Sequence, residues 1–271
     1  MSETGGPLII IGGHEDKEDR LEILRTIASE IAGGKLVIAT VASHKPEGYF
    51  ETYQEAFAKL GQHNLVELYV NERAESHQEE TLAPLIDAAG VFFSGGDQLR
   101  ISSQIGDTPI ERMVRDIHRR GGLIAGTSAG AAAMSEIMLV KGSSAETHRI
   151  GDLHMAPGLG LVRDAIIDQH FAERGRIGRL MGAVAQNPRV VGIGIDENTA
   201  IVVRGSSFTV IGEGAVYIVD GEEVSHSNIS EAEPHRTLSM HDVRLHVLSR
   251  GDGFDIPTRR PTAAVPDEGR A

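Results

Sequence analysis

The chain has 271 residues, 40% of them hydrophobic and 24% charged, an ordinary composition for a globular protein with one large core. It contains no cysteine, which excludes disulfides, a thiolate nucleophile and cysteine-bound metal. The formal net charge of -13 argues against nucleic acid or an anionic membrane as a partner. The N-terminus has no signal-peptide pattern, and no apolar run approaches the roughly 20 residues that span a bilayer.

Strand-like and helix-like segments alternate through the first half of the chain. The predicted strands cover residues 8–11, 36–41, 65–70, 91–93 and 123–125, and the predicted helices cover 17–31, 50–60, 82–89 and 110–120. This alternation predicts a mainly parallel sheet with helices on both faces, a three-layer α/β/α domain. Its active site is expected at the carboxyl ends of the strands.

The pattern changes after Gly182 to short strand-like segments separated by turns. They cover residues 190–195, 200–203, 208–211 and 215–219, and predict a C-terminal β section that completes the same domain. From Gly251 the chain has three prolines and little apolar content. We therefore expect residues 1–259 to form a single catalytic α/β domain and residues 260–271 to be a disordered tail.

The pattern Gly126-Thr127-Ser128-Ala129-Gly130 follows a predicted strand and leads into an alanine-rich segment. This spacing is typical of a nucleophile elbow, a tight strand-to-helix turn that lifts a serine hydroxyl clear of the sheet. The amide of Ala129 would then be an oxyanion donor, a contact commonly worth about 3 kcal/mol of barrier. The alternative is a structural turn of small residues; the strand-then-helix context favours the nucleophile.

A nucleophilic serine needs a base, and the sequence offers twelve histidines. Most of them lie in polar or loop-like surroundings. His170 differs, because it stands in the highly charged segment "DQHFAERGRIGRL" (168–180). On spacing alone, a solvated charged helix remains the slightly better interpretation of that segment.

Four segments together resemble the cyanophycinase family of the peptidase E-like serine hydrolases. They are "GTSAGA" (126–131), "GGDQ" (95–98), "DQHFAERGRIGRL" (168–180) and "GIGIDENTA" (192–200), and the opening "LIIIGGHEDK" (8–17) agrees with them. The resemblance extends from about residue 8 to about residue 259. It implies a fold similar to class I glutamine amidotransferases and hydrolysis of cyanophycin, a polyaspartate carrying arginine on each β-carboxyl, to β-aspartyl-arginine dipeptides. It further implies a cytoplasmic homodimer that needs no cofactor and no metal.

The resemblance also implies roles for individual residues. Ser128 would be the nucleophile, His170 the general base and acid, and Glu146 the carboxylate that orients the imidazole. Asp168, Asp196 and Glu197 stay open as alternatives to Glu146, because sequence order cannot place a carboxylate beside a histidine. The amides of the Gly95-Gly96 turn would join that of Ala129 in the oxyanion hole.

The implied substrate pocket combines charges of both signs. Its predicted members are Gln98, Asp168, Gln169, Arg174, Arg176, Arg179 and Glu197. Arginines grip carboxylates bidentately, which suits the α-carboxylate of the pendant arginine. Asp168, Gln98 and Glu197 would receive the guanidinium. We expect about one of the three arginines to be structural instead.

Several rival functions fit parts of the same sequence. An α-aspartyl dipeptidase of the peptidase E type would share the serine turn without needing the arginine-rich segment. An α/β-hydrolase esterase would take its histidine late in the chain, from His235, His241 or His246. A related glutaminase would need a cysteine. The rival of another class is a binding protein that has kept the fold and lost the chemistry.

Overall fold

The computed structural model describes residues 5–142, 149–231 and 236–262, and a nine-stranded sheet dominates this part of the chain. In spatial order its strands are β17 (Arg260–Thr262), β16 (Gly253–Asp255), β11 (Ser207–Gly212), β10 (Thr199–Arg204), β1 (Leu8–Ile11), β5 (Leu123–Thr127), β4 (Ala88–Phe93), β2 (Lys35–Ala39) and β3 (Leu65–Leu68). Neighbours from β1 to β3 are parallel, and those from β17 to β1 are antiparallel. The predicted parallel core is confirmed.

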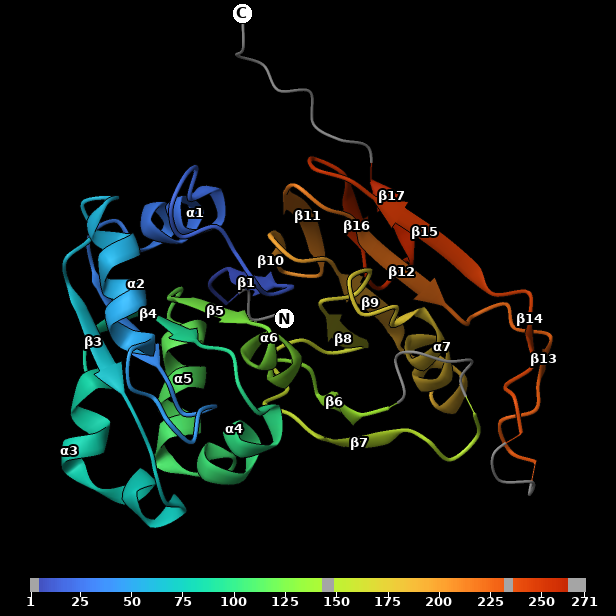
Figure 1. Cartoon of the computed structure of the whole chain (residues 1–271), viewed down its shortest axis with the longest axis horizontal. Helices are drawn as coiled ribbons and strands as arrows, with labels where there is room; N and C mark the ends of the chain where they lie inside the picture. Colours follow the sequence, from blue (N-terminus) through green and yellow to red (C-terminus); the bar gives the residue numbers. More distant parts are fainter. Residues whose placement is uncertain (1–4, 143–148, 232–235, 263–271) are drawn as a thin grey trace, which may run out of the picture.

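Helices cover both faces of the parallel strands. On one face are α1 (Glu22–Ile31) and α2 (Tyr49–Ala58), and on the other are α4 (Gln98–Ile105), α5 (Pro109–Arg119) and α6 (Ala129–Ala133). Successive side chains of β1 alternate between these layers, so that Ile9 packs in the first cluster and Ile10 in the second. The predicted three-layer architecture is confirmed (Figure 1).

A second, four-stranded sheet stands beside the first (Figure 1). Its order is β15 (Arg244–Leu248), β12 (Val216–Asp220), β9 (Val191–Ile195) and β8 (Ala165–Gln169), with only the β8–β9 pair parallel. One face shares the larger core cluster with the main sheet, and the other packs against α7 (Ile177–Gln186). Two short ribbons, β6 (Ile137–Lys141) with β7 (His154–Pro157) and β13 (His226–Ser227) with β14 (Met240–His241), complete the fold.

Some predicted element boundaries differ from the structure. The helix predicted over 82–89 is not formed: η1 (Arg73–His77) and α3 (Glu79–Leu82) precede it, η2 (Ala83–Leu85) covers only its first part, and β4 begins at Ala88. Pro84 and the left-handed backbone of Asp87 (φ 55°) prevent a continuous helix there. The helix predicted from residue 17 begins only at Glu22, because the Asp16 carboxylate accepts the amides of residues 18–21 in a preceding turn. Helix α4 was not predicted.

The C-terminal boundary also needs a correction. Residues Arg260–Thr262, predicted as the start of a disordered tail, form β17 and pair with β16 at the edge of the main sheet. Pro261 is tolerated there because an edge strand needs fewer amide donors. The remaining tail, residues 263–271, lies outside the described residues, and so does Glu146. Among the described helices, none has the length and apolarity to cross a membrane.

The two sheets bring their carboxyl strand ends to one place. Ser128 follows β5 and Gly12 follows β1 in the main sheet, whereas His170 follows β8 in the second sheet. Residues 196–198 cross from the end of β9 to the start of β10, and so pass from one sheet to the other. This convergence assembles residues from distant parts of the sequence.

Candidate active site

Ser128 occupies the sharp turn between β5 and α6. Its backbone (φ 51°, ψ −110°) is a conformation that L-residues rarely adopt. The turn closes tightly around small residues. A Cβ built on Gly126 would lie 2.6 Å from backbone atoms of Gly130, and one built on Gly130 would lie 2.3 Å from the Phe93 carbonyl oxygen. The glycines are therefore required by close packing, and the predicted nucleophile elbow is the geometry observed.

His170 presents its ring to this serine. The Ser128 hydroxyl lies 2.9 Å from His170 Nε2, and the His170 side chain is only 4% exposed. The His170 amide donates to the Gly12 carbonyl oxygen at 2.8 Å, which ties the end of β8 to the end of β1. Gly13 leaves room for the ring, because a Cβ there would lie 2.3 Å from His170 Cε1.

Glu197 is the carboxylate behind the imidazole. Its Oε1 lies 2.5 Å from His170 Nδ1, so Nδ1 carries a proton and Nε2 is free to accept the serine proton. Glu146, predicted for this place, lies outside the described residues. Glu197 was predicted as a pocket residue and was also one of the alternatives to Glu146, and its contact with His170 agrees with the second of these roles. Sequence order hid this contact, because the strands carrying His170 and Glu197 meet only in the second sheet.

The surroundings shift the titration of both groups. Burial lowers the pKa of His170 below its ordinary 6.5, the hydrogen bond to Glu197 opposes that shift, and the positive charge of Arg174 adds to it. Burial alone would raise the pKa of Glu197, but hydrogen bonds from His170 and His14 outweigh it and lower this pKa from 4.5. Near neutral pH the pair is therefore an uncharged imidazole and a carboxylate.

His14 provides a contact that the sequence did not predict. Its Nδ1 lies 2.9 Å from Glu197 Oε2, the oxygen not used by His170. The two imidazole rings meet edge to face with centroids 5.3 Å apart. The signal was present in the sequence, since His14 follows a Gly-Gly pair at the end of a parallel strand, but His14 was grouped with the histidines in polar or loop-like surroundings.

Asp196 and Glu173 support the loops that hold the histidine and the carboxylate. The two Asp196 oxygens accept the amides of Ala172 (2.9 Å) and Ala215 (3.1 Å). Glu173 accepts the amide of Glu197 at 3.1 Å. Asp196, one of the alternatives for the orienting acid, is therefore occupied by backbone amides.

The residues predicted for the oxyanion hole lie next to the serine. A Cβ built on Gly95 would lie 3.5 Å from Ser128 Cβ and 3.9 Å from its Oγ. Gly96 has φ 143° and packs against the Ala42 carbonyl, so a side chain there would clash at 2.4 Å. Ala129 is the first residue of α6, directly after the serine. These positions agree with the predicted hole, whose function stays a prediction.

The predicted substrate ligands Asp168, Arg176 and Arg179 form an internal ion cluster. Arg179 Nε donates to Asp168 Oδ2 at 2.7 Å, and Arg176 Nη1 donates to Asp168 Oδ1 at 3.2 Å. Asp168 is 1% exposed, and both arginines are under 10% exposed. Burial lowers the pKa of Arg176 to about 10, against the raising effect of Asp168. Two guanidinium groups share one buried carboxylate, which indicates a structural role for the three residues, and their predicted role as pocket ligands stays a prediction.

The other predicted pocket residues divide between interior and surface. Gln169 is 5% exposed, and its side-chain oxygen accepts from Arg176 Nη1 at 2.9 Å. Gln98 donates to the Leu139 carbonyl oxygen at 2.7 Å. Arg174 is exposed, and no guanidinium partner for it occurs among the described residues. Arg174 is therefore the cation of this segment that faces outward.

Among the described residues, one group of side chains brings potential metal-ligand atoms close together. His14, His170 and Glu197 each offer an atom within 4.8 Å of the others. The facing atoms are already joined as donor and acceptor, so hydrogen bonding accounts for the arrangement. The prediction that the reaction needs no metal stays a prediction.

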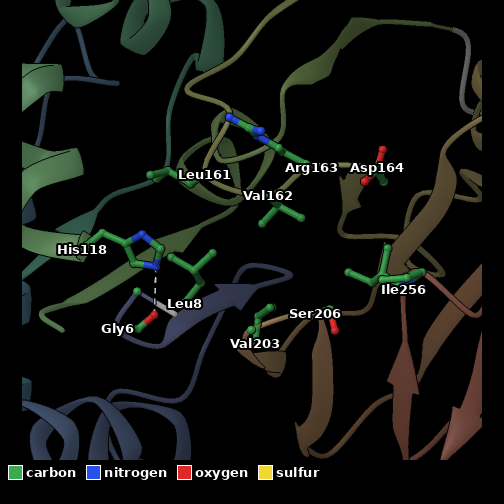
Figure 2. A pocket seen from close by; sticks show the side chains of 13 residues that line it. Gly6, Leu8, His118, Leu161, Val162, Arg163, Asp164, Val203, Ser206 and Ile256 are labelled. Atoms are coloured by element: carbon green, nitrogen blue, oxygen red, sulfur yellow. Dashed lines mark hydrogen bonds between the residues drawn. The ribbon is translucent and has the colours of Figure 1, made fainter. Parts of the chain in front are cut away.

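A cavity of about 240 Å³ lies at the opposite ends of the strands. Figure 2 shows Leu8, Val203 and Asp164 on its wall, together with the hydrogen bond that His118 Nε2 donates to the Gly6 carbonyl oxygen at 2.8 Å. Leu8 begins β1, whereas Ser128 lies beyond the end of β5. The cavity is thus separate from the serine site.

Comparisons with known proteins identify the family of the chain. Residues 8–211 match the model of peptidase family S51. The chain is 40% identical over 266 residues to a protein named cyanophycinase from Trichormus variabilis, covering 97% of this chain and 89% of that protein. It is 36% identical to a cyanophycinase from Geminocystis herdmanii, covering 95% and 96%. A crystal structure of a peptidase from an acI-B1 Actinobacterium superposes with a TM-score of 0.70 at 20% identity, covering 94% of this chain and 99% of that one.

Proposed function

The chain belongs to peptidase family S51 and is a serine-type peptidase, and we propose that it hydrolyses cyanophycin to β-aspartyl-arginine dipeptides through an acyl-enzyme on Ser128. The observation that carries this proposal is the hydrogen-bond chain from Ser128 through His170 to Glu197. Relatives named cyanophycinase at 36–40% identity over nearly the whole chain support the substrate.

In the first half-reaction, Ser128 Oγ attacks the carbonyl carbon of a backbone peptide bond. The hydroxyl proton passes to His170 Nε2, and the carbonyl π electrons move onto oxygen to give a tetrahedral oxyanion. Amides of Gly95, Gly96 and Ala129 are the proposed donors to that oxyanion. Collapse breaks the C–N bond, and the leaving nitrogen takes the proton from His170.

In the second half-reaction, water replaces the departed amine. His170 removes its proton, and the hydroxide equivalent attacks the ester carbonyl. Collapse breaks the ester bond and returns the proton to Ser128. Glu197 stays ionised throughout and stabilises the imidazolium that forms in both halves. These steps use only side chains and backbone amides of this chain and water.

Recognition requires both charges of the arginine-bearing unit. The exposed Arg174 is the proposed partner of the pendant α-carboxylate, since its charge already acts on His170. Asp168 and Glu197, predicted for the guanidinium, are occupied by other side chains. Gln98 keeps its amide oxygen, and Glu173 offers an exposed carboxylate that also holds the Glu197 amide. We propose that these two receive the guanidinium.

We also infer a homodimer in the cytoplasm. The family resemblance supports the dimer, and the exposed Leu245 (47%) and Val247 (58%) on the edge strand β15 offer an apolar surface for it. An intracellular storage polymer as substrate supports the location. Light scattering on purified protein tests the first inference, and fractionation of cells producing the chain tests the second.

One experiment tests the activity and its mechanism together. Insoluble cyanophycin granules are incubated with the wild type and with Ser128→Ala, and soluble dipeptide is measured. We expect release by the wild type and a loss of about 10⁶-fold in the variant. Cleavage of aspartyl dipeptides without granule breakdown would support the rival α-aspartyl dipeptidase. Granule binding without release would support the binding protein.

A further inference from the structure

The loop after β1 brings a second histidine to the carboxylate of the site. Glu197 accepts from His170 at Oε1 and from His14 at Oε2, at 2.5 Å and 2.9 Å. The mechanism above uses only the first contact. His14 itself is 74% exposed, whereas the Glu197 side chain is 25% exposed.

This loop is fixed on both sides of His14. The Gly13 carbonyl oxygen accepts the Asn198 amide at 2.9 Å, and the Asp16 amide donates to Asn198 Oδ1 at 2.9 Å. These two bonds join the loop to the chain segment that carries Glu197. His14 is therefore held beside Glu197 by the backbone.

Buried hydrogen bonds also fix the loop that carries His14. The Glu15 carboxylate accepts from Tyr53 (2.5 Å) and from Thr127 (2.6 Å), and Thr127 is the residue before the nucleophile. Glu15 is 3% exposed. His14 also adopts a left-handed backbone, with φ 47°. Strain of this kind persists only where the surroundings over-determine it.

We propose that His14 is a positioning residue, which donates from Nδ1 to Glu197 Oε2 and so holds the carboxylate against His170. This inference rests on the proposed function of Ser128 and His170. A partly exposed carboxylate with one partner can rotate about its last bond or turn toward water. A second donor on the opposite oxygen restricts that rotation and keeps Oε1 on the histidine.

The exposure of His14 limits the size of the effect. Hydrogen bonds to exposed charged groups contribute little net energy, since water competes for both partners. We therefore expect His14→Ala to lower the rate of serine acylation by about 3- to 10-fold. A positioning role predicts that this loss falls on kcat, with KM unchanged.

His14→Asn is the matched control. Asparagine Nδ2 stands the same number of bonds from the backbone as histidine Nδ1, and asparagine tolerates the left-handed backbone at this position. We expect it to restore most of the wild-type rate. Alanine adopts the left-handed backbone less readily than histidine or asparagine, so His14→Gly, which adopts it freely and has no donor, separates the lost donor from a change in the loop.

The test measures phosphorylation of Ser128 by diisopropyl fluorophosphate, with chelator present to remove trace metal. In this step the Oγ–P bond forms, the P–F bond breaks, fluoride leaves, and the hydroxyl proton goes to His170. The rate reports the serine, histidine and glutamate without any cyanophycin. Ser128→Ala gives the background. Mass spectrometry counts one adduct per chain.

A double-mutant cycle with Glu197→Gln completes the experiment. If His14 acts through Glu197, His14→Ala slows the reaction in the wild-type background and leaves Glu197→Gln unchanged. An equal loss in both backgrounds, or none in either, overturns the proposal, as does failure of asparagine to rescue. If the wild type reacts with diisopropyl fluorophosphate but does not hydrolyse cyanophycin, the proposed substrate is wrong. The double-mutant cycle still tests the role of His14 in that case. A wild type that reacts no faster than Ser128→Ala overturns both.

Discussion

The two segments that build the site position their residues by different physics. The serine turn, residues 126–130, contains no charged residue. Its glycines lie so close to neighbouring backbone atoms that a side chain in their place would clash. The histidine segment, residues 168–179, is dense in charge and relies on a buried Asp168 gripped by Arg176 and Arg179. The first arrangement is steric, and the second is electrostatic.

The difference determines what each segment shows in the sequence. A steric requirement selects small residues at fixed spacing, so the elbow can be recognised locally. The sequence reveals which charged residues lie in such a segment but not which way their side chains point. The same arginines could face a substrate or an aspartate inside the protein, and only the three-dimensional arrangement separates these cases.

Apart from loss of the serine itself, the largest expected effect comes from Glu197→Gln. The amide can donate to His170 Nδ1, which leaves the proton on Nε2 and blocks acceptance from Ser128. We expect kcat/KM to fall by about 10³- to 10⁴-fold, with folding retained. Steady-state dipeptide release measures it, and Glu55→Gln on the exposed face of α2 serves as the control.

The pH profile gives the same substitution a second readout. The base must be uncharged, so kcat/KM of the wild type falls as pH drops through the pKa of His170. Burial holds that pKa below 6.5, and the Glu197 hydrogen bond raises it. Loss of this hydrogen bond in Glu197→Gln should lower the pKa of His170, and so move the acid limb of the kcat/KM profile to lower pH. A limb that moves upward would contradict the contact.

Asp168→Asn tests the electrostatic segment. The substitution leaves two buried guanidinium groups without their carboxylate, which typically costs about 3–5 kcal/mol of unfolding free energy. For a chain of this size we expect Tm to fall by roughly 6–20 °C. The matched control is Asp116→Asn, in an exposed ion pair with Arg119 where Asp116 is 47% exposed. If both variants melt like the wild type, the cluster is not structural.

Prediction from sequence succeeded where the pattern was local. Ser128 was found from its turn, and the helix–strand alternation predicted the layered sheet. Glu197 belonged to a recognised motif but stood only among the alternatives to Glu146, because His170 precedes it by 27 residues and the two meet only beyond the ends of β8 and β9. His14 was missed for the same reason, being 183 residues from Glu197.

Gly130→Ala tests the steric segment. The new methyl group would lie 2.3 Å from the Phe93 carbonyl oxygen, so the elbow must shift. Overpacking of this kind costs about 1–3 kcal/mol. We expect a lower Tm together with a lower kcat. Gly95→Ala is the comparison, because its methyl group would make an ordinary 3.5 Å contact with Ser128 Cβ and should leave Tm unchanged.

Arg174→Gln has the smallest expected effect and sharpens the division within the arginine segment. Arg174 is exposed, whereas Arg179 is 6% exposed and paired with Asp168, so only Arg179→Gln should lower Tm. Loss of the proposed carboxylate partner should raise KM for cyanophycin by about tenfold, about 1.4 kcal/mol, with kcat nearly unchanged. The Arg174 charge lowers the pKa of His170, so the acid limb of kcat/KM should also move to slightly higher pH. An unchanged KM together with that pH shift would mean that Arg174 acts on the base and not on the substrate.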